Sequence, residues 1–214
     1  MVKEMVEILF PATKNIDEVV GIIDKYRMKL GLNTDMRLAQ FLAQVREETG
    51  PEFKVIRENL NYKEESALKL FKNMTAADAE KYARDENTPV ADQVAIANIA
   101  YANKLGNGKA DSNGNRTLDK DDDGWKYRGA GCLQITGKSN FAEVEKRIKK
   151  YAGVEMNPDT LEGFILMGMG FWIWQDLYVA ADTNVTDNVT AKINKYTESY
   201  ANRRKYFDSI KHLA

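Results

Sequence analysis

The chain contains 214 residues, 43% of them hydrophobic, which is enough for one globular domain or for two closely packed lobes. Its formal net charge of −1 gives no support for a phosphate-binding surface, so we expect no nucleic-acid partner. One cysteine, Cys132, excludes an intramolecular disulfide, and one histidine, His212, nearly excludes hydrolases whose zinc has several histidine ligands.

Neither a secretion signal nor a membrane span is expected. Residues 1–7 include acidic side chains where a signal peptide needs a basic and then an apolar run. The longest apolar stretch, residues 164–174, is too short to cross a bilayer and is interrupted by Gly168 and Gly170. We interpret it as a buried core helix whose glycines allow close packing, and we expect no membrane insertion.

Capping and stop signals predict helices along most of the chain. Alternation of polar and apolar residues is scarce, and only residues 127–136 could form a short hairpin. No repeat, linker or second module is recognisable, so we expect a mainly α-helical single domain over residues 1–214. Asn15-x-x-Glu18 is interpreted as a capping box that opens a helix ending near residue 30, and Thr75-x-x-Asp78 opens another helix. The other predicted helices begin near residues 35, 61, 88, 157 and 198.

The helix predicted from residue 35 places one carboxylate beside its apolar side. At 100° per residue, Leu38 and Phe41 share one stripe, Glu48 falls at the edge of that stripe, and Glu47 points the opposite way. An apolar wall desolvates a carboxylate and favours its protonated form, as a general acid near neutral pH requires. A glutamate half in water at a helix end is the alternative interpretation.

A second carboxylate, Glu58, follows ten residues later, after Gly50 and Pro51 have ended the helix. A helix end followed by a turn and an extended return can hold two acids across a cleft. Two carboxylates in unlike environments can supply the acid and the base that hydrolyse a glycosidic bond. In a chain with 32 acidic residues, however, two neighbouring acids do not by themselves identify an enzyme.

An acidic, glycine-rich segment over residues 106–124 partly matches a calcium-binding loop. Arg116 stands where such a loop needs glycine, and Asp122 replaces the usual bidentate glutamate. A solvated acidic loop is the alternative, and we assign no metal. The candidate ligands are Asp111, Asn113, Asn115, Asp119 and Asp122.

The segment over residues 124–141 concentrates glycines and neutral polar side chains. Its glycines indicate tight turns or a close approach of the backbone to a ligand. Gln134, Thr136 and Asn140 could line one face, and their amide and hydroxyl groups suit sugar hydroxyls and N-acetyl amides. Cys132 lies among apolar residues and is interpreted as a small buried hydrophobe. A structural turn is the alternative for the segment as a whole.

Four segments in this order resemble bacteriophage endolysins of the family 19 chitinase type. They include Glu-Glu-Thr-Gly at residues 47–50, Glu-Asn-Leu-Asn-Tyr at 58–62, the stretch 95–108, and the stretch 124–141. The resemblance covers roughly residues 35–210. It implies a mainly α-helical, lysozyme-like fold and hydrolysis of the β-1,4 link in bacterial peptidoglycan.

The resemblance also implies roles for individual residues. Glu48 matches the general acid, Glu58 matches the base that activates water, and Thr136 matches a residue that helps to hold this water. This chain departs from the pattern at Glu47, where histidine is usual. The substrate-binding residues that we predict are Gln134, Asn140, Asn194, Tyr127 and Arg204.

The C-terminal part of the resemblance contains a further departure. Asn194 belongs to a pattern that continues with two glycines, and here Lys195 and Tyr196 replace them. The adjacent Arg203 and Arg204 match a pair of arginines in the last helix. The resemblance implies that one of the two arginines pairs with a catalytic carboxylate.

We therefore expect an inverting glycosidase that needs no cofactor and acts as a monomer on the glycan strands of peptidoglycan. With no secretion signal and no wall-binding module expected, it would be made in the host cytoplasm and reach the wall after membrane permeabilisation. One alternative is a chitinase that acts on chitin oligomers. The other is a non-catalytic sugar- or calcium-binding module, which Glu47 in place of histidine favours.

Overall fold

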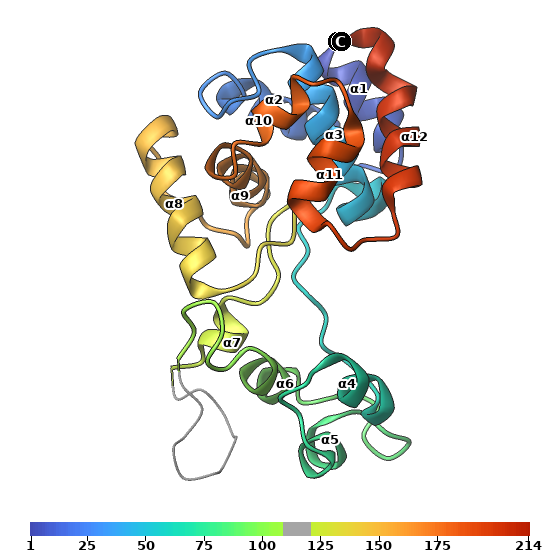
Figure 1. Ribbon diagram of the computed structural model, residues 1–214, viewed down its shortest axis with the longest axis vertical. Helices are drawn as coiled ribbons and strands as arrows, with labels where there is room; N and C mark the ends of the chain where they lie inside the picture. The colour runs from blue at the N-terminus through green and yellow to red at the C-terminus, as the bar shows by residue number, and fades with distance from the viewer. Residues whose placement is uncertain (109–120) are drawn as a thin grey trace. The chain divides into compact units, whose positions relative to one another are not determined.

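The computed structural model describes residues 1–108 and 121–214 (Figure 1). The described residues form twelve α-helices and no β-strand, which confirms the predicted mainly α-helical, lysozyme-like class. They divide into two compact units, which we describe separately. Unit 1 comprises residues 1–56, 130–135 and 143–214, and unit 2 comprises residues 57–129 and 136–142. That the whole chain acts as one catalytic domain stays a prediction.

Unit 1 is built around helix α3, which contacts α1, α10, α11 and α12. Thr34 caps the start of α3 by accepting a hydrogen bond from the Arg37 amide, and Gly50, at φ 72°, ends it. The helices of this unit are α1 (Val2–Leu9), α2 (Ile16–Tyr26), α3 (Asp35–Thr49), η1 (Gly50–Glu52), α8 (Lys138–Ala152, whose first turns belong to unit 2), α9 (Leu161–Trp174), α10 (Leu177–Ala181), α11 (Thr186–Asn194), α12 (Tyr200–Ile210) and η2 (Lys211–Leu213).

The apolar helix α9 lies in the core of unit 1, as the sequence predicts. A β-carbon on Gly168 would overlap the sulfur of Cys132, and one on Gly170 would lie 2.9 Å from Val144 and Ile148 of α8. Both glycines are therefore needed for the close approach of these segments. No helix among the described residues is both long and apolar enough to cross a membrane.

Unit 2 contains α4 (Glu64–Leu70), α5 (Ala76–Tyr82), α6 (Gln93–Ala100) and the short α7 (Asp123–Lys126). Thr75 and Asp78 form the predicted capping box at the start of α5. Helix α6 supplies much of the core, against which aromatic rings from other segments pack. The partly buried rings at this core are Tyr62, Phe71, Tyr101 and Trp125.

Three predicted helix starts are wrong, two of them because the expected capping side chain bonds elsewhere. Asn61 accepts a hydrogen bond from the Ala91 amide, and α4 begins only at Glu64. Asn157 accepts from the Asp159 amide in a local turn, so Thr160 caps α9 instead.

The third wrong start is that of α6, which begins at Gln93 with Asp92 as its cap, rather than near residue 88. The amide of Thr88 is taken by the Asp85 side chain in a turn before the helix. Helix α2 does follow Asn15, but its predicted capping box is wrong because the Asn15 side chain makes no capping bond. The helix also ends at Tyr26 rather than near residue 30.

The other two sequence predictions concern loops. The possible hairpin over residues 127–136 is reduced to one isolated bridge between Ala130 and Ile135. The candidate calcium ligands Asp111, Asn113, Asn115 and Asp119 lie outside the described residues. The fifth candidate, Asp122, is described and accepts a hydrogen bond from the Asn98 side chain.

Candidate active site

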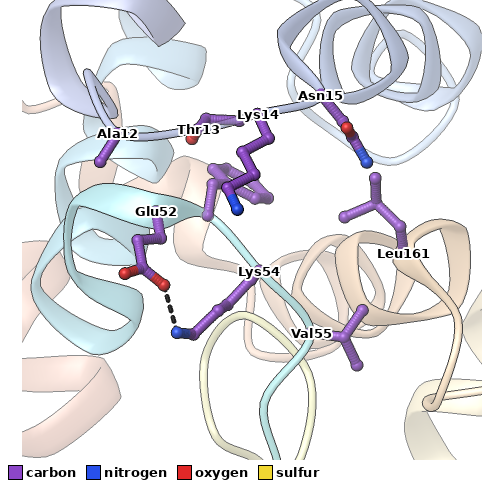
Figure 2. Close-up of a pocket in the computed structure, with 9 residues that line it drawn as sticks. Ala12, Thr13, Lys14, Asn15, Glu52, Lys54, Val55 and Leu161 are labelled. Carbon is purple, nitrogen blue, oxygen red and sulfur yellow. Dashed lines mark ion pairs between the residues drawn. The ribbon is translucent and has the colours of Figure 1, made fainter.

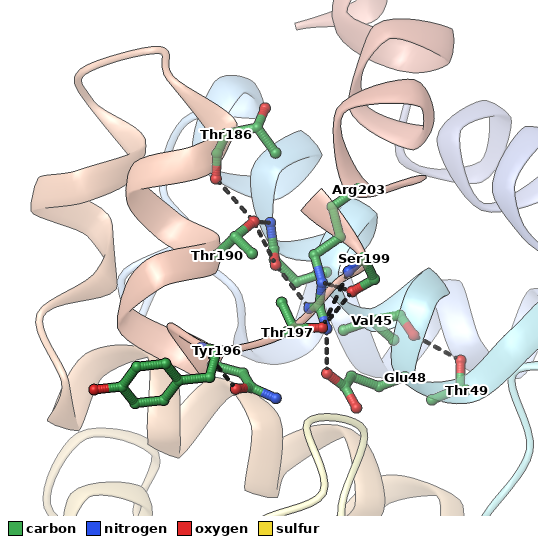
Figure 3. Close-up of polar contacts among 11 residues, drawn as sticks. Val45, Glu48, Thr49, Thr186, Thr190, Tyr196, Thr197, Ser199 and Arg203 are labelled. Carbon is green, nitrogen blue, oxygen red and sulfur yellow. Dashed lines mark hydrogen bonds and ion pairs between the residues drawn. The ribbon is translucent and has the colours of Figure 1, made fainter. Parts of the chain in front are cut away.

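Glu48 lies in the last turn of α3, where its side chain is 22% exposed. Its Oε1 atom accepts a hydrogen bond of 2.6 Å from Nη2 of Arg203 on α12 (Figure 3). Its Oε2 atom has no hydrogen-bond partner among the described residues. The carboxyl group is therefore held through one of its two oxygens.

Arg203 is almost completely buried, at 2% exposure, and all three nitrogens of its guanidinium donate hydrogen bonds. Besides Glu48, it contacts Oε1 of Gln44 at 2.8 Å and Oγ of Ser199 at 3.0 Å (Figure 3). A buried cation needs such partners because desolvation would otherwise destabilise it strongly. The guanidinium is thus fixed on three sides within unit 1.

The structure corrects the environment that the helix phase predicts for Glu48. The sequence places this carboxylate at the edge of an apolar stripe, and the residues Leu38 and Phe41 of that stripe are indeed fully buried. The structure adds the charge of Arg203, which comes from 155 positions further along the chain. Neighbouring Glu47 makes no hydrogen bond or ion pair within the described part of the chain, so the two glutamates differ in their contacts.

Glu58 belongs to unit 2 and is held by its neighbours at three atoms. Its Oε1 atom accepts from the Tyr101 hydroxyl at 2.6 Å, and its Oε2 atom accepts from the Gly129 amide at 3.1 Å. Its backbone amide donates to the Gly129 carbonyl at 2.9 Å. Two hydrogen-bond donors therefore hold the two oxygens of the Glu58 carboxylate in place.

Glu58 contributes to raised pKa values of two neighbouring tyrosines. Burial, followed by the hydrogen bond to the Glu58 carboxylate, raises the pKa of Tyr101. Burial and the charge of Glu58 also raise the pKa of Tyr62. Both phenols therefore stay protonated over the neutral range, and Tyr101 remains a hydrogen-bond donor to Glu58.

Three predicted site residues belong, like Glu58, to unit 2. The Thr136 carbonyl accepts from the Asn140 side-chain amide at 2.8 Å, and the Thr136 hydroxyl makes no hydrogen bond within the described residues. The Tyr127 ring packs edge-on against Phe141, with centroids 5.2 Å apart. A free hydroxyl on Thr136 is compatible with the predicted role of holding water.

The remaining predicted residues lie in unit 1. Gln134, at φ 50°, donates from its side chain to the Gly131 carbonyl at 3.1 Å. Asn194 is exposed at the end of α11 and accepts from the Tyr196 amide at 3.3 Å. Arg204 is exposed and pairs with Asp187, so Arg203 is the arginine that contacts Glu48. The substrate-binding roles of Gln134, Asn194 and Arg204 stay predictions.

Three residues that the sequence does not single out support the two glutamates, Tyr101 by direct contact with Glu58 and Gln44 and Thr190 by way of Arg203. Gln44 lies one helical turn before Glu48 and is fully buried, and this i, i+4 spacing was the available signal. Thr190 on α11 and Tyr101 after α6 gave no such signal, because their partners lie 146 and 43 positions away.

Comparison with known proteins decides the family. No protein-family model matches the chain. The chain is 33% identical over 186 residues to a glycosyl hydrolase family 19 domain-containing protein of Haemophilus influenzae, and the match covers 85% of this chain and 82% of that protein.

This chain belongs to glycosyl hydrolase family 19.

Family 19 membership establishes a glycoside hydrolase at the level of the family. The thiol of Cys132 is fully buried, and this burial raises its pKa, which disfavours the thiolate that a cysteine nucleophile needs. Cys132 is therefore a core residue of this family 19 chain, as the sequence analysis predicts.

A cavity of about 490 Å³ in unit 1 of this family 19 chain contains none of the predicted site residues (Figure 2). Glu52 and Lys54 form an ion pair at its rim, and the hydrogen bond and charge of Lys54 lower the pKa of Glu52. The cavity therefore shares no residue with the candidate active site. Its lining comprises Ala12, Thr13, Lys14, Asn15, Glu52, Phe53, Lys54, Val55 and Leu161.

Proposed function

We propose that this family 19 glycoside hydrolase cleaves the β-1,4 glycan backbone of bacterial peptidoglycan and acts as a phage endolysin in lysis of the host cell. The observation that carries the proposal is the half-buried Glu48, one oxygen of which is held by Arg203 while the other has no partner in the described part of the chain. A general acid in this role must be held in position and keep one oxygen available to the leaving group. The resemblance to endolysins of this type supports the choice of peptidoglycan.

In the proposed reaction Glu48 protonates the glycosidic oxygen through its free Oε2 atom. Glu58, held by Tyr101 and Gly129, takes a proton from water as the water attacks the anomeric carbon. The Thr136 hydroxyl accepts one hydrogen bond from this water or donates one to it. A single displacement of this kind inverts the configuration at the anomeric carbon.

The sugars would be held by neutral side chains and by one cation. Side-chain amides suit N-acetyl groups because an amide can both donate a hydrogen bond to an N-acetyl group and accept one from it. Arg204 could exchange its exposed partner Asp187 for an anionic group of the substrate. No cofactor takes part. The proposed substrate-binding residues are Gln134, Asn140, Asn194, Tyr127 and Arg204.

We further propose that the protein is made in the host cytoplasm and reaches the wall after the membrane has been permeabilised. It would act there as a monomer on glycan strands. Addition of purified protein to intact and to permeabilised cells tests this route, because lysis of permeabilised cells alone is expected.

The test of the proposed activity compares Glu48→Gln with Glu47→Gln on purified peptidoglycan, with release of reducing ends as the readout. Glu48→Gln should abolish cleavage, since glutamine keeps the contact with Arg203 but cannot give a proton. Glu47→Gln should retain much of the activity. Equal losses in both variants would show that the roles of the two glutamates are assigned wrongly.

A chitinase that acts on chitin oligomers is the second candidate, because the family 19 relationship is common to both activities. The same assay with chitin oligomers separates them. Faster cleavage of chitin oligomers than of peptidoglycan would favour the chitinase. Binding of either glycan without cleavage would favour a non-catalytic module, for which Glu47 in place of histidine is the sequence argument.

A further inference from the structure

The buried contacts behind Arg203 continue beyond the ion pair with Glu48. Gln44 on α3 is fully buried, as is Thr190 on α11. The side-chain amide of Gln44 lies between Arg203 and Thr190, with Oε1 2.8 Å from Nη1 of Arg203 and Nε2 3.2 Å from Oγ1 of Thr190. The contact with Glu48 is therefore the outer end of a chain of buried polar groups.

Hydrogen-bond chemistry allows one orientation of this amide. A guanidinium has only donors, so the Gln44 atom that faces Arg203 must be the oxygen. The amide nitrogen then donates to the Thr190 hydroxyl at 3.2 Å, and this hydroxyl has two oxygens to which it can donate, the Thr186 carbonyl at 3.1 Å and Oε1 of Gln44 at 3.3 Å. Both polar atoms of the Gln44 side chain and the Thr190 hydroxyl thus have hydrogen-bond partners within the chain of buried groups.

We propose that Gln44 and Thr190 are positioning residues, which hold the Arg203 guanidinium in the orientation that fixes one oxygen of Glu48. Neither residue touches substrate, and both act through Arg203. This inference rests on the proposed role of Glu48 as the acid. It adds that the orientation of the Glu48 carboxyl group depends on a neutral amide and a hydroxyl that are buried behind Arg203.

The hydroxyl of Thr190 is the point at which the proposal can be tested with least disturbance. Thr190→Val has nearly the same shape but cannot accept from the Gln44 amide, whereas Thr190→Ser keeps the hydroxyl and loses a methyl group. A role in packing alone would make the serine variant at least as impaired as the valine variant. The positioning role predicts the opposite order.

The kinetic readout is the split between kcat and KM on the glycan that the wild-type protein cleaves faster. Loss of a hydrogen bond to a charged group corresponds to a change of roughly tenfold to hundredfold in an equilibrium or rate constant. Thr190→Val and Gln44→Met should each lower kcat about tenfold and leave KM unchanged. Thr190→Ser should stay within about twofold of the wild-type protein.

The double variant Gln44→Met/Thr190→Val tests whether the two residues act in one chain. Because Thr190 acts only through Gln44, the double variant should lose no more kcat than Gln44→Met alone. Multiplicative losses would overturn the chain. Melting temperatures of all variants identify any that fail to fold, and the valine and serine pair then carries the test.

A spectroscopic readout keeps this inference separate from the proposed function. In ¹⁵N-labelled protein a guanidinium held at all its nitrogens gives resolved side-chain signals, and the signals missing from Arg203→Lys assign those of Arg203. They should broaden or merge in Thr190→Val and Gln44→Met but not in Thr190→Ser.

Three outcomes decide the matter. If Thr190→Val loses the resolved Arg203 signals but the wild-type protein cleaves neither glycan, the result would support positioning and contradict the proposed function. Unchanged signals in Thr190→Val would overturn positioning, whether or not kcat falls. Loss of the signals in Thr190→Val together with lower kcat, both restored in Thr190→Ser, would support both.

Discussion

Replacement of Arg203 by methionine should destabilise the protein far more than the same replacement of its neighbour Arg204. Both arginines lie on α12 and both pair with a carboxylate, but Arg203 has a side-chain exposure of 2% and Arg204 one of 49%. Loss of one partner from a buried ion pair leaves an unpaired charge in a poorly solvated position. Loss of an exposed pair leaves a charge that water can solvate.

The magnitude follows from burial. Breaking a buried pair typically costs about 3–5 kcal/mol. Because the Glu48 side chain keeps 22% of its exposure, water can reach part of it, and we expect the lower end, about 3 kcal/mol. An exposed pair such as Arg204 with Asp187 contributes about 0–1 kcal/mol. In a chain of this length each kcal/mol lowers the melting temperature by about 2–4 °C.

The assay is thermal unfolding followed by circular dichroism. Arg203→Met should melt about 6–12 °C below the wild-type protein, and Arg204→Met should melt within about 4 °C of it. Equal shifts in the two variants would refute the reasoning, since they would mean that the buried contacts of Arg203 contribute no more than a surface pair.

The remaining predictions concern packing, substrate contact and pH. Gly168→Ala should lower the free energy of unfolding by about 1–3 kcal/mol through overlap with Cys132, whereas Gly21→Ala, with open space around it, should raise it by up to about 1 kcal/mol; urea denaturation of both variants checks this. Tyr196, at 89% exposure, has an aromatic ring on which a sugar could stack, with the Lys195 ammonium 5.9 Å from the ring centroid. Tyr196→Ala should therefore raise KM severalfold at unchanged kcat in the reducing-end assay, and an unchanged KM would contradict this. Because the folded-state pKa of Tyr101 is raised, the unfolded chain loses this proton first, so stability should fall as pH rises above about 10. The fall should be smaller in Tyr101→Phe, as measured by urea denaturation at several pH values.

Local signals in the sequence predicted several elements because nothing distant competes with them. Helix α3 matches its prediction, since its apolar period, its start near residue 35 and its end at Gly50 are all local features. The capping box at the start of α5 formed because Thr75 and Asp78 bond to each other. Where a distant segment captures the side chain, as with Asn61 and the Ala91 amide, the local signal fails.

The candidate site was predictable only in part for the same physical reason. Helix phase distinguished Glu48 from Glu47, and the resemblance singled out Glu58. The partners that hold the two carboxylates come from far along the chain, namely Arg203 at 155 positions and Tyr101 at 43 positions. Such contacts arise from tertiary packing, and no short-range pattern in the sequence specifies them.

The stereochemistry of the product tests the central claim most directly. A glycan oligomer from purified peptidoglycan is cleaved in an NMR tube, and the first reducing ends are recorded before they mutarotate. If Glu48 protonates the leaving group while Glu58 activates water, the β-linked substrate should release α-anomers. Release of β-anomers with a trapped glycosyl-enzyme would make Glu58 a nucleophile and contradict the account, and so would the absence of any new reducing end.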